Sequence, residues 1–228
     1  MHDSINNNIK VFKERFLDAC SKSSRQASDI SIIAVSKKKE NSIIRQVFAD
    51  GFKNFGENFA QELAQKSEDL KDLNIVWHFI GPIQSNKVNL VASSADWVHS
   101  IDRKKIISKL DNACKKNNKV MNVCIQINID NEDTKSGIHP DNLLEFSAFI
   151  KEHANLKLRG MMVLPKLSDD LTHNEKVMGK CFALHANLKL VHPDADILSM
   201  GTTSDFESAI KCGSNMIRIG ESIFGKRL

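Results

Sequence analysis

The sequence predicts a closed (β/α)8 barrel of the TIM type, and three observations carry this prediction. Apolar segments and amphipathic segments alternate eight times along 228 residues, after one extra helix at the N-terminus. The apolar run from Ile32 to Val35 lacks the alternation of a half-buried strand, so we expect a strand buried on both faces, as in parallel sheets. No Gly-x-Gly-x-x-Gly turn follows the first strand, which disfavours the main alternative, an open doubly wound sheet.

The N-terminal half reads as one helix followed by four strand–helix pairs. Apolar residues at helical spacing predict a helix over about 3–25, with Asp3 or Ser4 as its cap. The strand over 32–37 precedes a helix that opens at Asn41 or Ser42 and ends before a glycine. Further apolar or aromatic runs predict strands over 52–55, 75–80 and 96–100. Helices with apolar residues three or four positions apart follow these strands, beginning near 59, 85 and 102.

The C-terminal half supplies four more strands in the same order. The longest is expected over 119–129 and leads into a polar loop over 130–137, and Pro140 or Asp141 opens the next helix. The remaining strands are expected over 156–164, 195–200 and 215–219, with glycines ending the last two. Helices are expected over 172–190, from Ser204 onward and, as a single turn, over 222–225. No linker interrupts the series, so we expect one domain over residues 1–228.

Composition narrows the functional classes. The net charge of +4 is modest and no basic run is interleaved with aromatic residues, which disfavours a nucleic-acid partner. The five cysteines form no Cys-x-x-Cys pair, as expected of reduced thiols in the cytosol. The first eight residues are too polar for a signal peptide, and no apolar run is long enough to cross a membrane. We therefore expect a cytoplasmic protein, and a closed barrel without an obvious apolar patch is expected to be a monomer.

Lys37 is the first candidate for chemistry. The apolar run from Ile32 to Val35 delivers it to the carboxyl end of a buried strand, where partial desolvation disfavours its charged form. The positive charges of Lys38 and Lys39 act in the same direction. An amine with a lowered pKa is the nucleophile that forms a Schiff base with an aldehyde. The alternative is a solvated lysine that closes a strand.

The turns after the last two strands are the candidate anion site. Gly201-Thr202-Thr203-Ser204 and Gly220-Glu221-Ser222 each open a helical segment, and small residues let backbone N–H groups approach a phosphate. Barrels of this type often hold phosphate between the loops after strands seven and eight. The carboxylate of Glu221 would have to point away from that phosphate. The alternative is that these residues only cap helices.

Two further polar residues lie inside apolar strands. Arg218 is always charged and needs an acceptor, either a neighbouring carboxylate or the ring nitrogen of a bound pyridine, which it would keep unprotonated. His78 follows a tryptophan and reads as a core histidine with satisfied hydrogen bonds. The other histidines show no metal-ligand spacing with cysteines or carboxylates.

Several motifs occur together and in order from about residue 32 to the C-terminus. They are Ala34-Val35-Ser36-Lys37, Phe55-Gly56-Glu57-Asn58, Trp77-His78-Phe79-Ile80-Gly81-Pro82, His99-Ser100-Ile101-Asp102-Arg103, Leu158-Arg159-Gly160-Met161-Met162, Leu198-Ser199-Met200-Gly201 and Arg218-Ile219-Gly220. With them the chain resembles the pyridoxal phosphate homeostasis proteins, the YggS/PROSC family. It departs from the family at Thr202-Thr203, where Met-Ser is usual.

This resemblance implies a barrel of the alanine racemase N-terminal type that binds pyridoxal 5′-phosphate. It matches Lys37 to the Schiff-base lysine and Arg218 to the arginine facing the pyridine nitrogen. It also matches Asn58 and His78 to pocket-lining positions. The phosphate-binding positions that it implies are Ser199, Gly201, Gly220 and Ser222.

The resemblance further implies a carrier of the cofactor without robust turnover. Alanine racemases use a lysine and a tyrosine from a second domain, and this chain contains no tyrosine. An arginine at the ring nitrogen also weakens the cofactor as an electron sink. We therefore expect a protein that buffers pyridoxal phosphate or delivers it through transient contact with apoenzymes, and Lys135 could accept the aldehyde during transfer. The alternatives are a weak amino-acid racemase or decarboxylase using the same cofactor, and a phosphosugar enzyme without it.

Overall fold

Eight parallel strands close into a barrel in the order β1 to β8, as the sequence predicts. In this computed structural model, which describes residues 2–132 and 135–225, every strand pairs with the next one along the chain and β8 pairs with β1. The strands are β1 (Ser31–Val35), β2 (Asn54–Glu57), β3 (Val76–Phe79), β4 (Trp97–Ile101), β5 (Met121–Ile127), β6 (Leu156–Val163), β7 (Ile197–Thr202) and β8 (Met216–Ile219).

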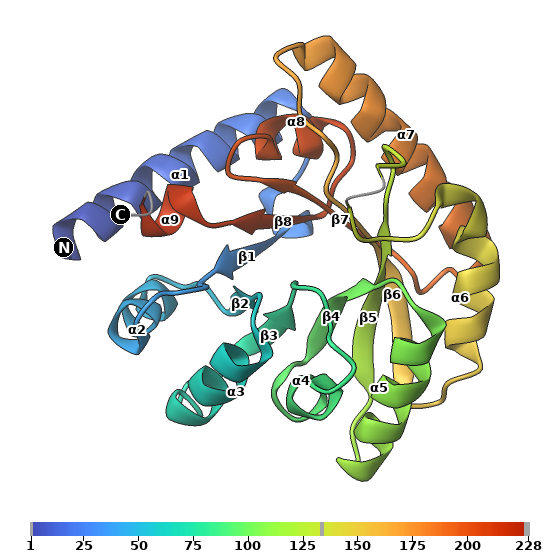
Figure 1. Cartoon of the computed structure of the whole chain (residues 1–228). Coiled ribbons are helices and arrows are strands. Elements are labelled where there is room, and N and C mark those ends of the chain that lie inside the picture. Colours follow the sequence, from blue (N-terminus) through green and yellow to red (C-terminus); the bar gives the residue numbers. More distant parts are fainter. Residues whose placement is uncertain (1, 133–134, 226–228) are drawn as a thin grey trace.

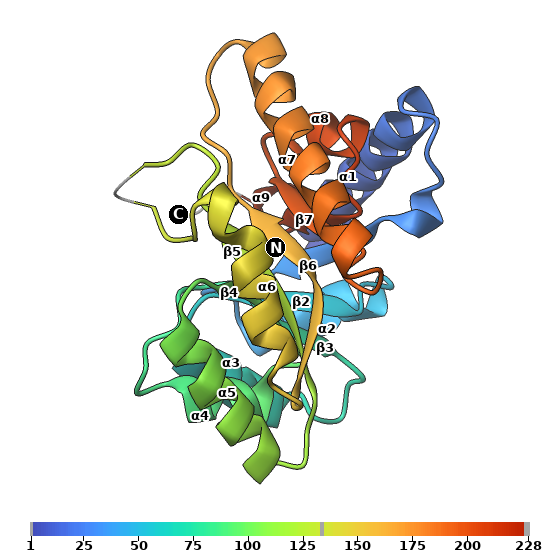
Figure 2. The ribbon, with the colours of Figure 1, turned by 90° about the vertical axis from the view of Figure 1, so that its right-hand side faces the viewer.

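Helices surround this barrel (Figure 1). They are α1 (His2–Lys22), α2 (Asn41–Ala49), α3 (Ala60–Asp69), α4 (Val88–Ser94), α5 (Lys104–Lys116), α6 (Leu143–Lys151), α7 (Leu171–Val191), α8 (Phe206–Lys211) and α9 (Glu221–Phe224). The extra helix α1 lies beside α8 and α9, so the two ends of the chain meet on one side of the barrel (Figure 1). The helices α6, α7 and α8 follow one another around the outside (Figure 2).

The main core lies between the outer faces of the strands and the helices. The aromatic ring of Phe12 on α1 is fully buried and packs edge-on against Phe206 of α8, with ring centroids 5.5 Å apart. On the barrel side, apolar residues such as Val98, Leu198 and Ile217 are also fully buried. Burying this apolar surface between the strands and the helices stabilises the barrel, and the neighbours His99, Ser199 and Arg218, also buried, point into its interior.

The boundaries of β2 and β7 differ from the prediction, and both differences affect the mouth of the barrel. The strand β2 covers Asn54–Glu57 instead of 52–55, so Glu57 is its last residue and is fully buried. The strand β7 extends to Thr202, so Gly201 lies inside the strand instead of ending it. Tertiary pairing with β3 and β8 decides these ends, whereas the apolar runs used for prediction mark only the strand centres.

Most of the predicted helix caps are wrong. Asp3 and Ser4 lie inside α1, and Glu40 precedes α2 in place of Asn41 or Ser42. The cap positions of α5 and α8 are Arg103 and Asp205, where Asp102 and Ser204 were expected. The Asp102 carboxylate instead pairs with the guanidinium of Arg103 at 2.9 Å. Residue type alone does not show which of two neighbouring polar residues has the non-helical backbone that defines the cap.

Within the described residues, no helix is both long and apolar enough to cross a bilayer.

Candidate functional site

Alternate residues of each strand point into the barrel, and the turn after β1 brings Lys37 to its mouth. A hydrogen bond of 3.1 Å joins His99 of β4 to Ser199 of β7, two strands that are not neighbours, so both side chains lie inside the barrel. Arg218 contacts the same serine and is therefore also inside. Ile33 lies opposite Arg218 in the β1–β8 register. The strand β1 ends at Val35, which shares the face of Ile33, so Lys37 lies in the following turn and not at the last strand position as predicted. This turn places Lys37 in the pocket wall with Val35.

A pocket of about 380 Å³ opens at this mouth, at the carboxyl ends of the strands. This volume is within the range of small-molecule sites. The apolar part of its wall comes from β1, β3 and β6 and the residues that follow them, and the polar part from the turns after β1, β2, β7 and β8. The lining residues are Val35, Lys37, Asn58, Ile80, Met162, Leu164, Thr202, Thr203, Ser204, Arg218, Gly220 and Glu221.

Four of the eight residues proposed from the sequence line this pocket together: Lys37, Asn58, Arg218 and Gly220. The half-buried Lys37 brings an amine, and the buried Arg218 brings a guanidinium. The other four residues do not line it. His78 and Ser199 lie deeper in the barrel, Gly201 lies within β7, and Ser222 is in the first turn of α9.

Arg218 is held by neutral partners instead of a carboxylate. Its Nη1 donates to the Ser199 hydroxyl at 2.7 Å, and its Nη2 donates to the Val163 carbonyl at 2.9 Å. Within the described part of the chain it forms no ion pair, although the charge of Asp205 acts on it. Burial lowers the pKa of Arg218 to about 10, so the group remains a cation at neutral pH. A buried guanidinium with remaining donors toward a pocket suits an acceptor atom on a ligand.

A chain of hydrogen bonds continues from Arg218 through the barrel interior. Ser199 contacts His99 Nδ1, His99 Nε2 contacts His78 Nδ1 at 2.9 Å, and His78 Nε2 contacts Asn54 Oδ1 at 3.1 Å. A guanidinium can only donate, so the Ser199 hydroxyl accepts from it and donates to His99. His99 then donates to His78, and His78 donates to Asn54. Every donor in this chain points away from Arg218, and both histidines are neutral.

The neutrality of these histidines has a physical cause. Burial lowers the pKa of His78 to about 3. Burial, together with the charges of His78 and Arg218, holds the pKa of His99 well below its usual value. The prediction of a satisfied core histidine at position 78 is therefore confirmed. The same groups make the stability of the fold depend on pH.

We expect the free energy of unfolding to fall as the pH drops below about 6.5. His78 and His99 stay neutral in the folded protein, whereas in the unfolded chain they become protonated over this range. Each histidine contributes a slope of about 1.4 kcal/mol per pH unit between its unfolded and folded pKa. Urea unfolding at pH 7, 6 and 5 measures this slope. In the His78→Gln variant one fewer group takes up a proton on unfolding, so the slope should be smaller by about 1.4 kcal/mol per pH unit, while all other groups titrate as before. Equal slopes in the two proteins would contradict a neutral His78.

The turns after β7 and β8 converge on one hydroxyl. The backbone N–H groups of Gly220 and Ser222 point at Thr203 Oγ1, at 3.3 and 3.4 Å. Asp205 holds the adjacent Thr202 by accepting from its N–H at 2.7 Å and from its hydroxyl at 2.6 Å. Two N–H groups aimed at one oxygen form an arrangement that suits an anion oxygen. Ser222 thus enters the site through its backbone.

Gly201 allows this turn to form. Its φ is +101°, a conformation that side-chain-bearing residues rarely adopt, and a Cβ there would lie 2.6 Å from Ala209 Cβ of α8. A glycine at this position therefore lets α8 pack against β7 and sets the direction of the Thr202–Ser204 turn. Its role in the structure is in the backbone, behind the pocket wall.

Asn58 follows β2 and is held by a close backbone approach. A Cβ on Gly81 would lie 2.1 Å from the Asn58 carbonyl oxygen, so only glycine permits this contact between the turns after β2 and β3. The Asn58 Oδ1 atom is buried, and in the part of the chain that the structure describes it has no hydrogen-bond partner. Buried acceptors in proteins are nearly always satisfied, so this atom is available to a ligand donor.

Sequence reasoning missed several residues of this site. Thr203 was treated only as a member of a turn, and His99 only as part of a motif, with no role assigned to its side chain. The apolar wall formed by Met162 and Leu164 gave no signal, because such residues are ordinary in a core.

Lys135 lines an adjoining pocket with Asn58, and its ammonium pairs with Glu132 at 3.2 Å and Asp130 at 3.7 Å. Within the described residues no cluster of histidine, cysteine and carboxylate side chains could hold a metal ion.

Comparison with known proteins agrees with this architecture. The family model for the alanine racemase N-terminal domain matches residues 3–227. The pyridoxal phosphate homeostasis protein of Haemophilus influenzae is 41% identical, over 98% of this chain and 96% of its own. The protein of the same name from Pasteurella multocida is 42% identical, over 98% of each chain. The solved structure of PipY from Synechococcus elongatus with PLP bound is 27% identical, covers 97% of this chain and all of its own, and has a TM-score of 0.83. The chain therefore belongs to the alanine racemase N-terminal domain family and, within it, to the family of pyridoxal phosphate homeostasis proteins.

Proposed function

We propose that this protein binds pyridoxal 5′-phosphate in the mouth pocket, holds it as a Schiff base on Lys37, and buffers or delivers it. The observation that carries this proposal is the placement of Lys37, Arg218 and the Thr203 turn around one pocket. The relatives named pyridoxal phosphate homeostasis protein and the PipY structure with PLP bound support it.

The residues present fit the cofactor. The pocket volume suits a substituted pyridine with one phosphate. The N–H groups of Gly220 and Ser222, now directed at Thr203, would hold the phosphate, with Gly201 shaping the turn. Arg218 would donate to the ring nitrogen, with Ser199 and His78 behind it in the hydrogen-bond chain. The unpartnered Asn58 Oδ1 would accept from the ligand. Glu221 also lines the pocket and would have to turn its carboxylate away from the phosphate.

The covalent step is simple and reversible. Lys37 would supply the amine that condenses with the aldehyde of the bound cofactor, with a C=N bond in place of the C=O bond and loss of one water. Water or another amine, including an apoenzyme lysine in transient contact, would reverse the condensation and release the aldehyde. The cofactor, when bound, supplies the aldehyde, and the chain supplies the amine and the shielding pocket.

Carrier function is favoured over turnover by the surroundings of the ring. Arg218 lines the pocket and stays a cation near neutral pH. It would therefore donate a hydrogen bond to the ring nitrogen and keep its own proton. The neighbouring histidines are buried and neutral and accept no proton near neutral pH. Racemisation needs an acid or base on each face of the reacting carbon. Lys37 supplies one face, and no tyrosine exists in the chain to supply the other.

The test has two parts. Purified protein mixed with pyridoxal 5′-phosphate should show an imine absorbance band at about 420 nm that borohydride removes, leaving a reduced adduct on Lys37. Peptide mapping of that adduct also shows whether Lys135 is modified. Isotope exchange at the α-carbon of common amino acids should stay at the level of free cofactor. Rapid exchange would favour the racemase or decarboxylase alternative, and the absence of any band would overturn the proposal.

A further inference from the structure

A buried lysine lies behind the loop that carries Lys37. Lys66 of α3 is 5% exposed, and its ammonium donates to the Ser36 carbonyl at 2.8 Å, to Glu57 Oε1 at 2.8 Å and to Glu62 Oε1 at 2.6 Å. The three hydrogens of the ammonium thus have three acceptors. We call these four residues, Ser36, Glu57, Glu62 and Lys66, the Lys66 clamp. No step of the function proposed above uses it.

The Lys66 clamp holds the backbone on both sides of Lys37. On one side, Ser36 offers its carbonyl to Lys66 and donates its hydroxyl to Glu57 Oε1 at 2.6 Å. On the other side, the Lys38 N–H donates to Glu62 Oε1 at 2.5 Å. Lys38 has a φ of +61°, uncommon for a residue with a side chain, and the Lys39 N–H closes the turn onto the Ser36 carbonyl. The turn is therefore held in a conformation that its residues would not adopt readily alone.

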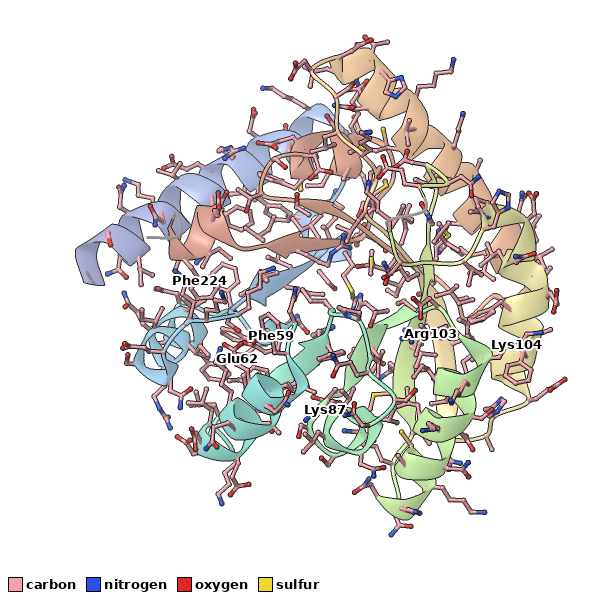
Figure 3. All side chains as sticks on the ribbon, viewed as in Figure 1. Phe59, Glu62, Lys87, Arg103, Lys104 and Phe224 are labelled. Carbon is pink, nitrogen blue, oxygen red and sulfur yellow. The ribbon has the colours of Figure 1, made fainter. Side chains whose placement is uncertain are left out.

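The clamp lies on the outer side of the barrel wall. Ser36 and Glu57 both contact Lys66 of α3, whereas their neighbours Lys37 and Asn58 line the pocket. Glu62 projects near the beginning of α3, beside the space between α2 and α3 (Figure 3). This placement leaves the clamp out of contact with a bound ligand and in contact with the peptide units that direct Lys37.

Stability alone does not account for this arrangement. Desolvating a lysine and a carboxylate costs about as much as their attraction returns, so buried ion pairs are weak evidence for a stabilising role. Burial raises the pKa of Glu57 against the opposing effect of Lys66, and Glu57 Oε2 has no hydrogen-bond partner in the described part of the chain. Every hydrogen of the Lys66 ammonium has an acceptor, and the loop has hydrogen bonds on both sides of Lys37, whereas one carboxylate oxygen of Glu57 lacks a donor among the described residues. What the cluster holds well is the loop.

We propose that the Lys66 clamp positions Lys37, so that its amine meets the aldehyde carbon of the cofactor at bonding geometry. This rests on the function proposed above. Lys66 and Glu62 act through the backbone of Ser36 and Lys38, and Glu57 acts through the Ser36 hydroxyl, so all three are positioning residues. The expected consequence is specific: loss of the clamp weakens imine formation and leaves noncovalent recognition of ring and phosphate unchanged.

The experiment compares two probes, pyridoxal 5′-phosphate and pyridoxine 5′-phosphate, which has the same ring and phosphate but no aldehyde. Dissociation constants are measured for both with the wild type, Lys37→Ala and Lys66→Met. Lys66→Met should lower the preference for the aldehyde about tenfold or more, since a small misplacement of a reacting group is costly. Its affinity for pyridoxine 5′-phosphate should stay within about twofold of the wild type. Lys37→Ala should remove the preference altogether.

The control and the second variant keep the outcomes separate. Lys119→Met removes another lysine that donates to a backbone carbonyl, that of Ala95, at the opposite end of the barrel, and should leave both affinities unchanged. If Lys66→Met does not fold, as judged by circular dichroism, Glu62→Ala replaces it, because Glu62 is more exposed and holds the Lys38 N–H. An unchanged preference in the folded variant, or an equal loss for both probes, overturns the positioning role. A wild type without any preference for the aldehyde overturns the proposed function itself.

Discussion

Replacing Lys37 by alanine is expected to abolish the absorbance band at about 420 nm that the protein acquires with pyridoxal 5′-phosphate. The reason is chemical: the imine requires a primary amine at the mouth of the barrel, and alanine removes it while the pocket remains. The fold should be retained, since Lys37 is half-buried after the end of β1. The measurement is an absorbance spectrum at equal cofactor concentration, followed by borohydride reduction and mass spectrometry.

Lys87→Ala is the matched control for this experiment. Lys87 lines a neighbouring pocket at the same mouth, which it shares with Asn58, but it does not line the pocket of Lys37 (Figure 3). Removing it should leave the band and the borohydride adduct as in the wild type. A band of full height in Lys37→Ala would assign the amine to another lysine, and loss of the band in both variants would indicate a general effect of charge.

Arg218→Ala is expected to weaken binding of pyridoxal 5′-phosphate by about 10- to 100-fold, the range for loss of a charged hydrogen-bond donor in a buried site. The substitution removes the donor to the ring nitrogen and also frees the Ser199 hydroxyl, which now accepts from Arg218. The fold should survive, since the buried cation has no ionic partner to leave uncompensated in the described chain. Equilibrium dialysis gives the affinity, and circular dichroism reports the fold.

Ser199→Ala separates the two effects of the arginine substitution. This variant removes the acceptor of Arg218 Nη1 and the donor to His99, while it keeps the guanidinium at the pocket. We expect a smaller loss of affinity than for Arg218→Ala. Equal affinity of wild type and Arg218→Ala would show that Arg218 only fills the barrel, and the ring nitrogen would then need another partner.

The main features of the fold could be predicted from the sequence because they depend on local patterns. Continuous β-branched runs mark strands buried on both faces, and their alternation with amphipathic helices allows few topologies. The ends of the elements could not be predicted so well. Glu57 read as part of a turn, yet pairing of β2 with β3 makes it a buried strand residue. Likewise, Gly201 read as the end of a strand, and the pairing of β7 with β8 runs past it to Thr202.

The candidate site shows the same division. Lys37 and Arg218 stood out because a cation beside or within an apolar strand is rare. The period of two directs Arg218 into the barrel, and the turn after β1 places Lys37 at the same pocket. The long-range contacts gave no local signal. The link from Asn54 through His78 and His99 to Ser199 joins four strands, and Lys66 reaches Ser36 across 30 residues.

The sequence by itself determined the barrel class, the position of Lys37 near the end of the first strand and the small residues that follow the last two strands, because each depends on residues close together in the chain. Only the tertiary structure decided which way the hydrogen bonds of the interior run, which atoms stay unpartnered and what holds the Lys37 loop. Those properties depend on closing eight strands into one cylinder, which brings side chains of distant strands within about 3 Å and excludes the water that would otherwise satisfy them.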